Sequence, residues 1–352
     1  MTLYDDLASL PLAVEDYDLS TRRRPTSSDF TRVTTVFALH GPGETGRGED
    51  VTYDEAEHDA LAEEGATIDF PTPGEYTLDE FSARLDTVDL FPAGDPEGEA
   101  ARHYRRWGLE SAALDLALRQ ADANLGTALD RSYDPVRFVV STRLGDPPAA
   151  DRVERFLDAD PTHEFKLDPT PDWTPELVET LADTGAVRIL DLKGQYEGTE
   201  VDGVADPELY GLLLDAFPEA VIEDPAFTDE TRPLFDGEEE RVSWDVPITD
   251  VASVEALPFE PDWLNVKPSR FGTVRDLLDT IEYCLENDVR PYGGGQFELD
   301  VGREHLHAVA SLFYPDAPND VAPSGYNDPD PGPELPSSPL QPPADPEGLG
   351  WN

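Results

Sequence analysis

Four short apolar segments between residues 187 and 270 each end in a residue suited to metal or proton chemistry, namely Asp191, Glu223, Asp245 and Lys267. Each segment contains β-branched residues and stops near a proline or a glycine, which is typical of a buried parallel strand. The sequence distances between the four residues match the roughly 20 to 35 residues of one strand–helix unit. We therefore expect these residues on successive strands of one sheet.

If that sheet closes into a barrel, the three acids and the lysine meet at the carboxyl ends of its strands, where parallel barrels have their active sites. Carboxylate oxygens are the ligands that Mg²⁺ prefers, and Mn²⁺ accepts the same donors. A neighbouring lysine can act as a base beside such a metal. The competing interpretation is that the acids only end strands or cap helices, as expected often among 76 acids. Their order on consecutive strands favours the metal site.

The chain contains three lysines, Lys166, Lys193 and Lys267, and each stands near the end of a predicted strand. A lysine acts as a base only when its pKa falls from about 10.4 toward 7 or 8. We expect a nearby cation to lower the pKa of Lys267 in this way. Lys166 and Asp168, on the predicted strand 163–168 that precedes the one ending at Asp191, are further catalytic candidates. The histidines are scattered and indicate no site of their own.

Strand-like and helix-like segments alternate seven times after residue 135, which is the pattern of a parallel α/β barrel. Besides the four segments above, the predicted strands cover 136–142, 163–168 and 290–298, with a weak eighth at 319–326. The predicted helices cover 149–157, 175–184, 207–217, 229–239, 253–257, 273–287 and 303–313. An open, doubly wound sheet is the alternative, but no Gly-x-Gly-x-x-Gly follows the first strand.

The region before the barrel reads as a small α+β domain. Segments 9–14 and 31–40 are predicted strands, and the polar stretch between them, which contains Arg22, Arg23 and Arg24, is predicted to be a loop. The apolar spacing of residues 105–119 predicts an amphipathic helix that leads into the barrel. Eleven prolines between Pro315 and Pro346 indicate an extended tail.

Asp191, Glu223 and Asp245, followed by Lys267-Pro-Ser-Arg-Phe-Gly, resemble the enolase superfamily, in particular its muconate-lactonising and o-succinylbenzoate-synthase-like branch. The resemblance implies a (β/α) barrel of the enolase C-terminal type with an N-terminal α+β capping domain. The expected domains are a capping domain at 1–100, a barrel at 101–325 and a proline-rich tail at 326–352 that returns to the capping domain. Mg²⁺, or Mn²⁺, is the implied cofactor, held by the three acids.

The resemblance also suggests roles for other residues. The family has Lys-x-Lys on the second strand, whereas this chain has Lys166-Leu-Asp168, so Asp168 holds the usual base position if Lys166 is the first lysine. Gly46-Arg-Gly48-Glu49 resembles a tight turn of the capping domain. The expected substrate-binding residues are Lys193, Arg22, Arg23, Arg24, Gln296 and Glu298. For these, a solvated loop, a simple ion pair or a packing bend is the alternative.

The implied activity is removal of a proton α to the carboxylate of a small carboxylic acid. The outcome is a lyase or dehydratase reaction or a cycloisomerisation, with epimerisation or racemisation as an alternative that needs two bases. A non-catalytic barrel that binds metal and carboxylate is the alternative of another class, because the second-strand motif departs from the family. Whether the chain forms a homo-oligomer is left open.

The net charge of −51, from 76 acids against 25 bases, is spread along the whole chain. Such a surface repels nucleic acid and anionic membranes, so neither is an expected partner. We interpret the charge as the adaptation of a halophile, because molar salt shortens the Debye length to about 3 Å. The one cysteine, Cys284, lies in an apolar helical segment. No leader or apolar span is evident, so a cytoplasmic location is expected.

Overall fold

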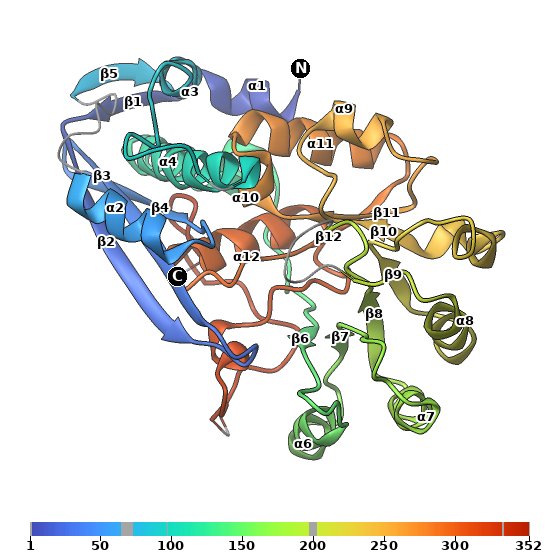
Figure 1. Ribbon diagram of the computed structural model, residues 1–352. Helices are drawn as coiled ribbons and strands as arrows, with labels where there is room; N and C mark the ends of the chain where they lie inside the picture. Colours follow the sequence, from blue (N-terminus) through green and yellow to red (C-terminus); the bar gives the residue numbers. More distant parts are fainter. Residues whose placement is uncertain (1, 65–72, 97, 197–202, 333, 352) are drawn as a thin grey trace.

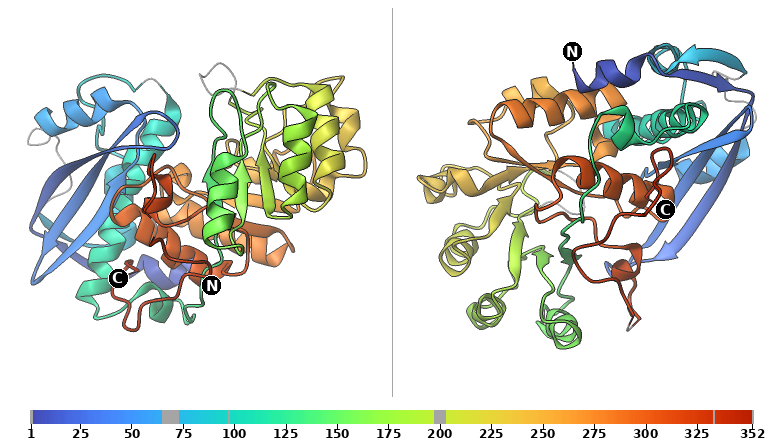
Figure 2. Two further views of the ribbon diagram at one scale, coloured as in Figure 1. Left: turned by 90° about the horizontal axis from the view of Figure 1, so that it is seen from below. Right: turned by 180° about the vertical axis from the view of Figure 1, so that it is seen from behind.

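The computed structural model describes residues 2–64, 73–96, 98–196, 203–332 and 334–351. Figure 1 shows a small N-terminal sheet with helix α4 (Glu99–Gln120) on one side of the molecule and a curled sheet of parallel strands with helices around it on the other. The two further views in Figure 2 show the same division, with the C-terminus lying near α4. No helix among the described residues is both long and apolar enough to span a membrane.

The described residues of the N-terminal part before α4 form one three-stranded antiparallel sheet, one two-stranded sheet and three helices. The strands are β1 (Pro11–Val14), β2 (Asp16–Pro25), β3 (Thr31–Gly41), β4 (Glu44–Asp50) and β5 (Gly74–Thr77), and the helices are α1 (Leu3–Ala8), α2 (Glu55–Glu64) and α3 (Leu78–Leu85). Strands β2, β3 and β4 pair in this order, and β1 pairs with β5 rather than with β3.

The prediction of a loop at Arg22, Arg23 and Arg24 was wrong. The three arginines lie on strand β2, paired with Thr34, Val33 and Arg32 of β3. Antiparallel sheets can present one face to water, and the side chains of β2 alternate between half-buried and exposed positions. A polar sequence therefore forms a strand here because its partner β3 supplies the buried residues.

The Gly46-Arg-Gly48-Glu49 segment is also a strand and not a tight turn. Gly46 and Gly48 lie on β4, where a Cβ atom would come within 2.2 Å of the Ala112 carbonyl oxygen or 2.0 Å of the Gly108 carbonyl oxygen of α4. These glycines are thus needed for close packing of helix against strand. Glu49 follows them and accepts hydrogen bonds from the backbone N–H groups of Leu299, Asp300 and Gly302 at 2.7–3.0 Å. Its carboxylate caps the start of a barrel helix and joins the two parts of the molecule.

The barrel strands form one parallel sheet of seven strands in sequential order, as predicted for this fold class. They are β6 (Val140–Thr142), β7 (Phe165–Leu167), β8 (Val187–Asp191), β9 (Val221–Glu223), β10 (Val242–Trp244), β11 (Trp263–Val266) and β12 (Arg290–Gly293). The weak eighth strand is reduced to two isolated parallel bridges, Phe138 with Asn319 and Gly294 with Asp320. Residues 319 and 320 thereby link the two edges of the curled sheet.

Helices cover the outside of the sheet. They are α5 (Leu125–Ala128), α6 (Asp151–Ala159), α7 (Pro175–Asp183), α8 (Pro207–Ala216), α9 (Val251–Glu255), α10 (Pro268–Phe271), α11 (Val274–Glu286) and α12 (Val301–Phe313). The predicted helix at 229–239 is absent, and the 3-10 turns η1 (Arg232–Phe235) and η2 (Glu239–Arg241) stand in its place. Pro233 and Gly237, which has φ 90°, interrupt a regular helix there. A third 3-10 turn, η3 (Ser324–Asn327), follows the eighth-strand bridges.

The C-terminal residues dock against α4 and the segment after it, rather than against the strands of the N-terminal sheet. Leu349 donates its backbone N–H to Asp115 Oδ1 at 2.9 Å, and the Gly348 carbonyl accepts from Leu125 at 3.0 Å. Asp115 is buried, and its other carboxylate oxygen accepts the N–H of Arg47 in β4. One carboxylate therefore ties the tail, α4 and the N-terminal sheet together.

Candidate active site

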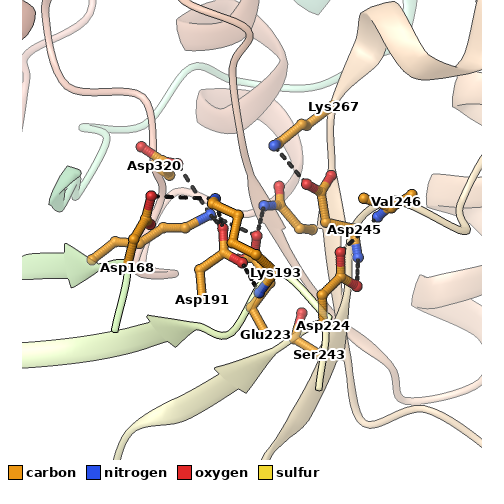
Figure 3. Close-up of polar contacts among 12 residues, drawn as sticks. Asp168, Asp191, Lys193, Glu223, Asp224, Ser243, Asp245, Val246, Lys267 and Asp320 are labelled. Atoms are coloured by element: carbon orange, nitrogen blue, oxygen red, sulfur yellow. Dashed lines mark hydrogen bonds and ion pairs between the residues drawn. The ribbon is translucent and has the colours of Figure 1, made fainter. Parts of the chain in front are cut away.

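The predicted metal and base residues all lie at the carboxyl ends of the barrel strands, here called the barrel mouth (Figure 3). Asp191 and Glu223 are the last residues of β8 and β9 and are paired in register. Asp245 directly follows β10, and Lys267 directly follows β11. Each strand contributes one of these side chains at the same level because all four strands are parallel. Asp191, Glu223 and Asp245 are fully buried, and Lys267 is nearly so.

Lys166 lies at the floor of the mouth and holds two of the three acids. Its ammonium group is 2.6 Å from Glu223 Oε1 and 3.3 Å from Asp191 Oδ2 and from Asp320 Oδ2. Burial alone would lower the pKa of Lys166, but the carboxylates of Glu223, Asp191 and Asp320 outweigh burial and raise it well above its usual value. Lys166 is therefore a buried, charged counter-ion.

Lys267 and Arg270 hold the third acid. The Lys267 ammonium donates to Asp245 Oδ2 at 2.7 Å, and Arg270 Nε donates to Asp245 Oδ1 at 3.0 Å. Burial opposes the charged form of Lys267, yet the carboxylate of Asp245 raises its pKa above the ordinary value. The lowered pKa expected for Lys267 beside a bound cation stays a prediction, because in this structure a carboxylate is the nearest charge to the amine.

Lys193 reaches across the β7–β8 side of the mouth. Its ammonium group hydrogen-bonds Asp191 and lies 3.5 Å from Asp168 Oδ2. The Asp168 carboxylate also lies 3.4 Å from Arg143 Nε. Burial would lower the pKa of Lys193, but the carboxylates of Asp168 and Asp191 raise it instead. The structure thus places Lys193, Asp168 and the metal candidate Asp191 in one connected cluster.

The other predicted substrate contacts do not join this cluster in the described contacts. Arg22, Arg23 and Arg24 each pair with acids, namely Asp300, Glu55 with Asp59, and Asp328, respectively. Gln296 accepts a 2.8 Å hydrogen bond from the Tyr53 hydroxyl, and its backbone N–H donates to Glu298 at 2.7 Å. The carboxylate of Glu298 also pairs with Arg303 at 3.1 Å. Gln296 therefore joins the loop after β12 to the N-terminal part.

Sequence reasoning missed several polar residues of the mouth. Tyr292 donates to Glu223 Oε2 at 2.5 Å, and Asn265 donates to Glu223 Oε1 at 3.1 Å. Tyr196 donates to Asp245 Oδ2 at 3.1 Å, and Arg270 and Asp320 contact the same cluster. Tyr292 and Asn265 sit inside predicted strands, where the alternation of inward positions was the available signal. Asp224, with φ 47°, accepts the N–H groups of Asp245 and Val246, as a turn residue does.

The cluster has more carboxyl groups than cationic side chains. The carboxyl groups are those of Asp168, Asp191, Glu223, Asp224, Asp245 and Asp320, and the cations are Arg143, Lys166, Lys193, Lys267 and Arg270. Burial and the neighbouring carboxylates of Asp191 and Asp245 raise the pKa of Glu223 to about 7. The pKa values of Asp224 and Asp320 are also raised, chiefly by burial. A shortage of positive charge among oxygen donors suits a divalent cation such as Mg²⁺.

The types of side chain suit a divalent cation, but their arrangement does not mark the position of one. Within the described ranges, no three carboxylate, imidazole or thiol groups converge as they would on one metal ion. Asp191, Glu223 and Asp245 instead each face a cationic side chain. The donor set thus fits Mg²⁺, and binding it requires these three carboxylates to exchange their lysine partners for the metal.

Solved structures share this fold. The chain superposes on a member of the enolase superfamily from Listeria innocua with a TM-score of 0.68 at 18% identity, covering 89% of this chain and 86% of the other. It superposes on the muconate lactonizing enzyme of Pseudomonas putida with a TM-score of 0.64 at 20% identity, covering 88% of each chain. The capped parallel barrel with its site at the strand ends is therefore the fold of the enolase superfamily.

Sequence comparison places the chain in a family with two domain models. Residues 132–328 match the model of the C-terminal domain of a family described as a domain of unknown function (DUF8230), and residues 5–128 match the N-terminal domain. The chain belongs to this DUF8230 family. It is also 25% identical over 226 residues to the o-succinylbenzoate synthase of Bacillus subtilis (strain 168), a match that covers 62% of this chain and 58% of that enzyme.

Proposed function

We propose that this protein is a Mg²⁺-dependent enzyme that removes a proton α to the carboxylate of a small carboxylic acid. The observation that carries the proposal is that Asp191, Glu223, Asp245 and Lys267 stand at the carboxyl ends of four successive barrel strands. The fold shared with a muconate lactonizing enzyme and the partial match to an o-succinylbenzoate synthase support it. We propose a lyase, dehydratase or cycloisomerase outcome.

The roles follow from the contacts of each side chain. Asp191, Glu223 and Asp245 would hold Mg²⁺, or Mn²⁺, whose charge would offset the negative charge that builds up when the α-proton leaves. Lys267 is the proposed base, and it can accept a proton once Asp245 pairs with a cation other than its own ammonium group. Arg270 keeps Asp245 in place during this exchange, since it binds the other carboxylate oxygen.

Lys166 is better suited to positioning than to proton transfer. All three of its carboxylate contacts lie within 3.3 Å, and its side chain is 2% exposed. Racemisation, which needs a base on each face of the substrate, would leave Asp168 as the second base on this strand. Elimination or cycloisomerisation can proceed with Lys267 as the one base, so we prefer these outcomes to racemisation.

Two measurements test the proposal. Calorimetric titration of metal-stripped protein at high monovalent salt should show one Mg²⁺ site per chain that is lost in Glu223→Gln and kept in Glu219→Gln, a matched change at an exposed position. Incubation with a panel of carboxylic acids in D₂O should then exchange the α-proton of at least one of them. Unchanged Mg²⁺ affinity in Glu223→Gln would mean that these acids are only strand-end residues.

A non-catalytic barrel that binds carboxylates is the second candidate. The Lys166-Leu-Asp168 motif favours it, because Asp168 stands where the resemblance implies a second lysine. Under this candidate, carboxylic acids bind and Mg²⁺ affinity depends on Glu223, but no α-proton exchanges in D₂O. The two candidates therefore differ in one measurable outcome.

A further inference from the structure

A cavity of about 370 Å³ opens beside the metal candidates on the β6–β8 side of the mouth. Its walls come from the segments after β6, β7 and β8, and from residues 27–29 between β2 and β3. Leu144, Trp173 and Leu192 provide apolar surface, while Arg143 and Lys193 are its two cationic side chains. A cavity of this size and mixed polarity is typical of a small-molecule site.

Lys193 is the lysine of the mouth that a ligand in this cavity can reach. Its side chain is 18% exposed, against 2% for Lys166 and 6% for Lys267, and Lys193 alone among the three lines the cavity. Its backbone has φ 56°, a left-handed conformation that is uncommon for a lysine. Its backbone N–H donates to Asp191 Oδ1 at 3.1 Å, and its carbonyl accepts from Gly203 at 3.0 Å. These contacts hold the residue over the mouth.

The charge partner of Lys193 and Arg143 inside the cavity is weakly held. Asp168 Oδ2 lies 3.5 Å from Lys193 Nζ and 3.4 Å from Arg143 Nε, both longer than a charge-assisted hydrogen bond of about 2.7–2.9 Å. The second oxygen, Asp168 Oδ1, is buried and has no hydrogen-bond partner among the described residues. Asp168 thus holds neither of these two cations closely, while Lys193 also hydrogen-bonds Asp191, and Asp29 and Asp146 are the other acids that line the cavity.

We propose that Lys193 and Arg143 bind the carboxylate of an organic acid in this cavity, and that Asp168 competes with that acid for the same two cations. The acid has a small apolar body that contacts Leu144, Trp173 and Leu192. The assignment of this acid as the substrate rests on the proposed function, whereas the binding itself does not require turnover. Lys193 then takes the substrate-facing place on the β7–β8 side that neither the enclosed Lys166 nor the acidic Asp168 fills.

The test uses benzoate as the probe and neutral benzamide as its isostere, with the full chain at one fixed high KCl concentration. Calorimetry should show saturable benzoate binding and none for benzamide. Lys193→Gln should weaken benzoate binding about tenfold or more, as expected for the loss of a charge-assisted hydrogen bond. Lys193→Arg should retain most of the affinity. Asp168→Asn should tighten binding roughly three- to tenfold, because it removes the competing carboxylate.

Opposite effects of the two changes separate this proposal from a structural ion pair. If Lys193 and Asp168 only stabilise the fold, both variants weaken binding alike, and the proposal fails. Arg290→Gln and Asp262→Asn are matched controls, since this exposed pair also lies 3.5 Å apart but at the amino-terminal ends of β11 and β12. Each control should change the affinity for benzoate by less than about twofold.

A chemical label locates the ligand directly, because the chain has three lysines. Reductive ¹³C-methylation keeps the positive charge and yields few signals, so benzoate should shift the Lys193 signal and leave that of Lys166 unchanged. A shift at Lys267 without one at Lys193 would overturn the assignment. Repeating the titration in EDTA distinguishes the two proposals: binding that persists there supports this subsite even if no Mg²⁺ site and no α-proton exchange are found. Loss of all benzoate binding in EDTA would contradict the subsite.

Discussion

Lys267 is the residue on which the proposed chemistry depends, and its partner Asp245 sets the conditions under which it acts. The 2.7 Å pair keeps the amine protonated, since the carboxylate raises its pKa. A base at this position therefore works only when Asp245 is engaged by another cation. Proton removal would therefore depend on which cation Asp245 binds, and not on Lys267 alone.

Lys267→Ala should abolish α-proton exchange while Mg²⁺ binding persists, because it removes the base and leaves Asp191, Glu223 and Asp245 in place. Loss of a general base lowers the rate by about 10² to 10⁴. NMR of the α-proton in D₂O measures exchange, and calorimetry measures the metal. Full exchange in this variant, together with loss of exchange in Lys166→Ala, would reverse the assignment of the base.

Lys166→Ala should act mainly on stability. The change leaves the carboxylates of Asp191, Glu223 and Asp320 buried without their shared cation, and breaking a buried ion pair costs roughly 3 to 5 kcal/mol. Denaturant unfolding at constant high salt measures the loss. Adding Glu223→Gln should recover part of it, since one buried charge is then removed. A Lys166→Ala protein as stable as the parent would show that water already solvates this ammonium group.

At the scale of elements, helix α12 joins the barrel to the N-terminal part and carries two buried histidines. Burial lowers the pKa of His305 and of His307 to about 4, with the Asp115 carboxylate opposing the shift at His305 and the Arg303 guanidinium adding to it at His307. Arg119 also disfavours the charged form of His305. Both histidines are therefore neutral in the folded protein at neutral pH.

The free energy of unfolding should fall as the pH drops from about 6.5 toward 4, because in this range the histidines bind protons in the unfolded chain but not in the folded one. The stabilisation is present above the ordinary histidine pKa and is lost below it, on the order of 3 kcal/mol for each histidine at most. Denaturant unfolding of the parent and of the His305→Gln/His307→Gln variant, at one molar salt concentration, measures the difference. Parallel pH profiles for the two proteins would contradict a role for these histidines.

The molecule as a whole carries a net charge of −51, which opposes compaction at low ionic strength. We expect the chain to be folded in molar KCl and largely unfolded at about 0.05 M, since only molar salt shortens the Debye length to about 3 Å. Far-UV circular dichroism across a KCl series measures this. Choline chloride at equal ionic strength is the control for specific cation binding. A fully folded chain at 0.05 M salt would refute the interpretation of the charge as an adaptation to high salt.

The sequence by itself determined where the barrel strands lie and which candidate site residues stand at their carboxyl ends. Short segments of β-branched residues predict where the parallel strands end, and four of them end at Asp191, Glu223, Asp245 and Lys267. The scarcity of lysine in so acidic a chain likewise singles out Lys166 and Lys193 as candidates. The polar strand β2 escaped prediction because its pattern makes sense only against the buried face of β3.

Only the tertiary structure decided which charges face one another. Lys166 on β7 contacts Asp320, which lies beside the end of β12 at the other edge of the sheet. Tyr292 on β12 donates a hydrogen bond to Glu223 on β9. No spacing along the chain records such pairs, because they depend on how the sheet curls and closes. The same closure places Lys267 against Asp245, whose carboxylate raises the pKa of the lysine, and it turns Lys193 toward Asp168 and the cavity. Side-chain types are written in the sequence, but the energy of a charge depends on distances that folding sets.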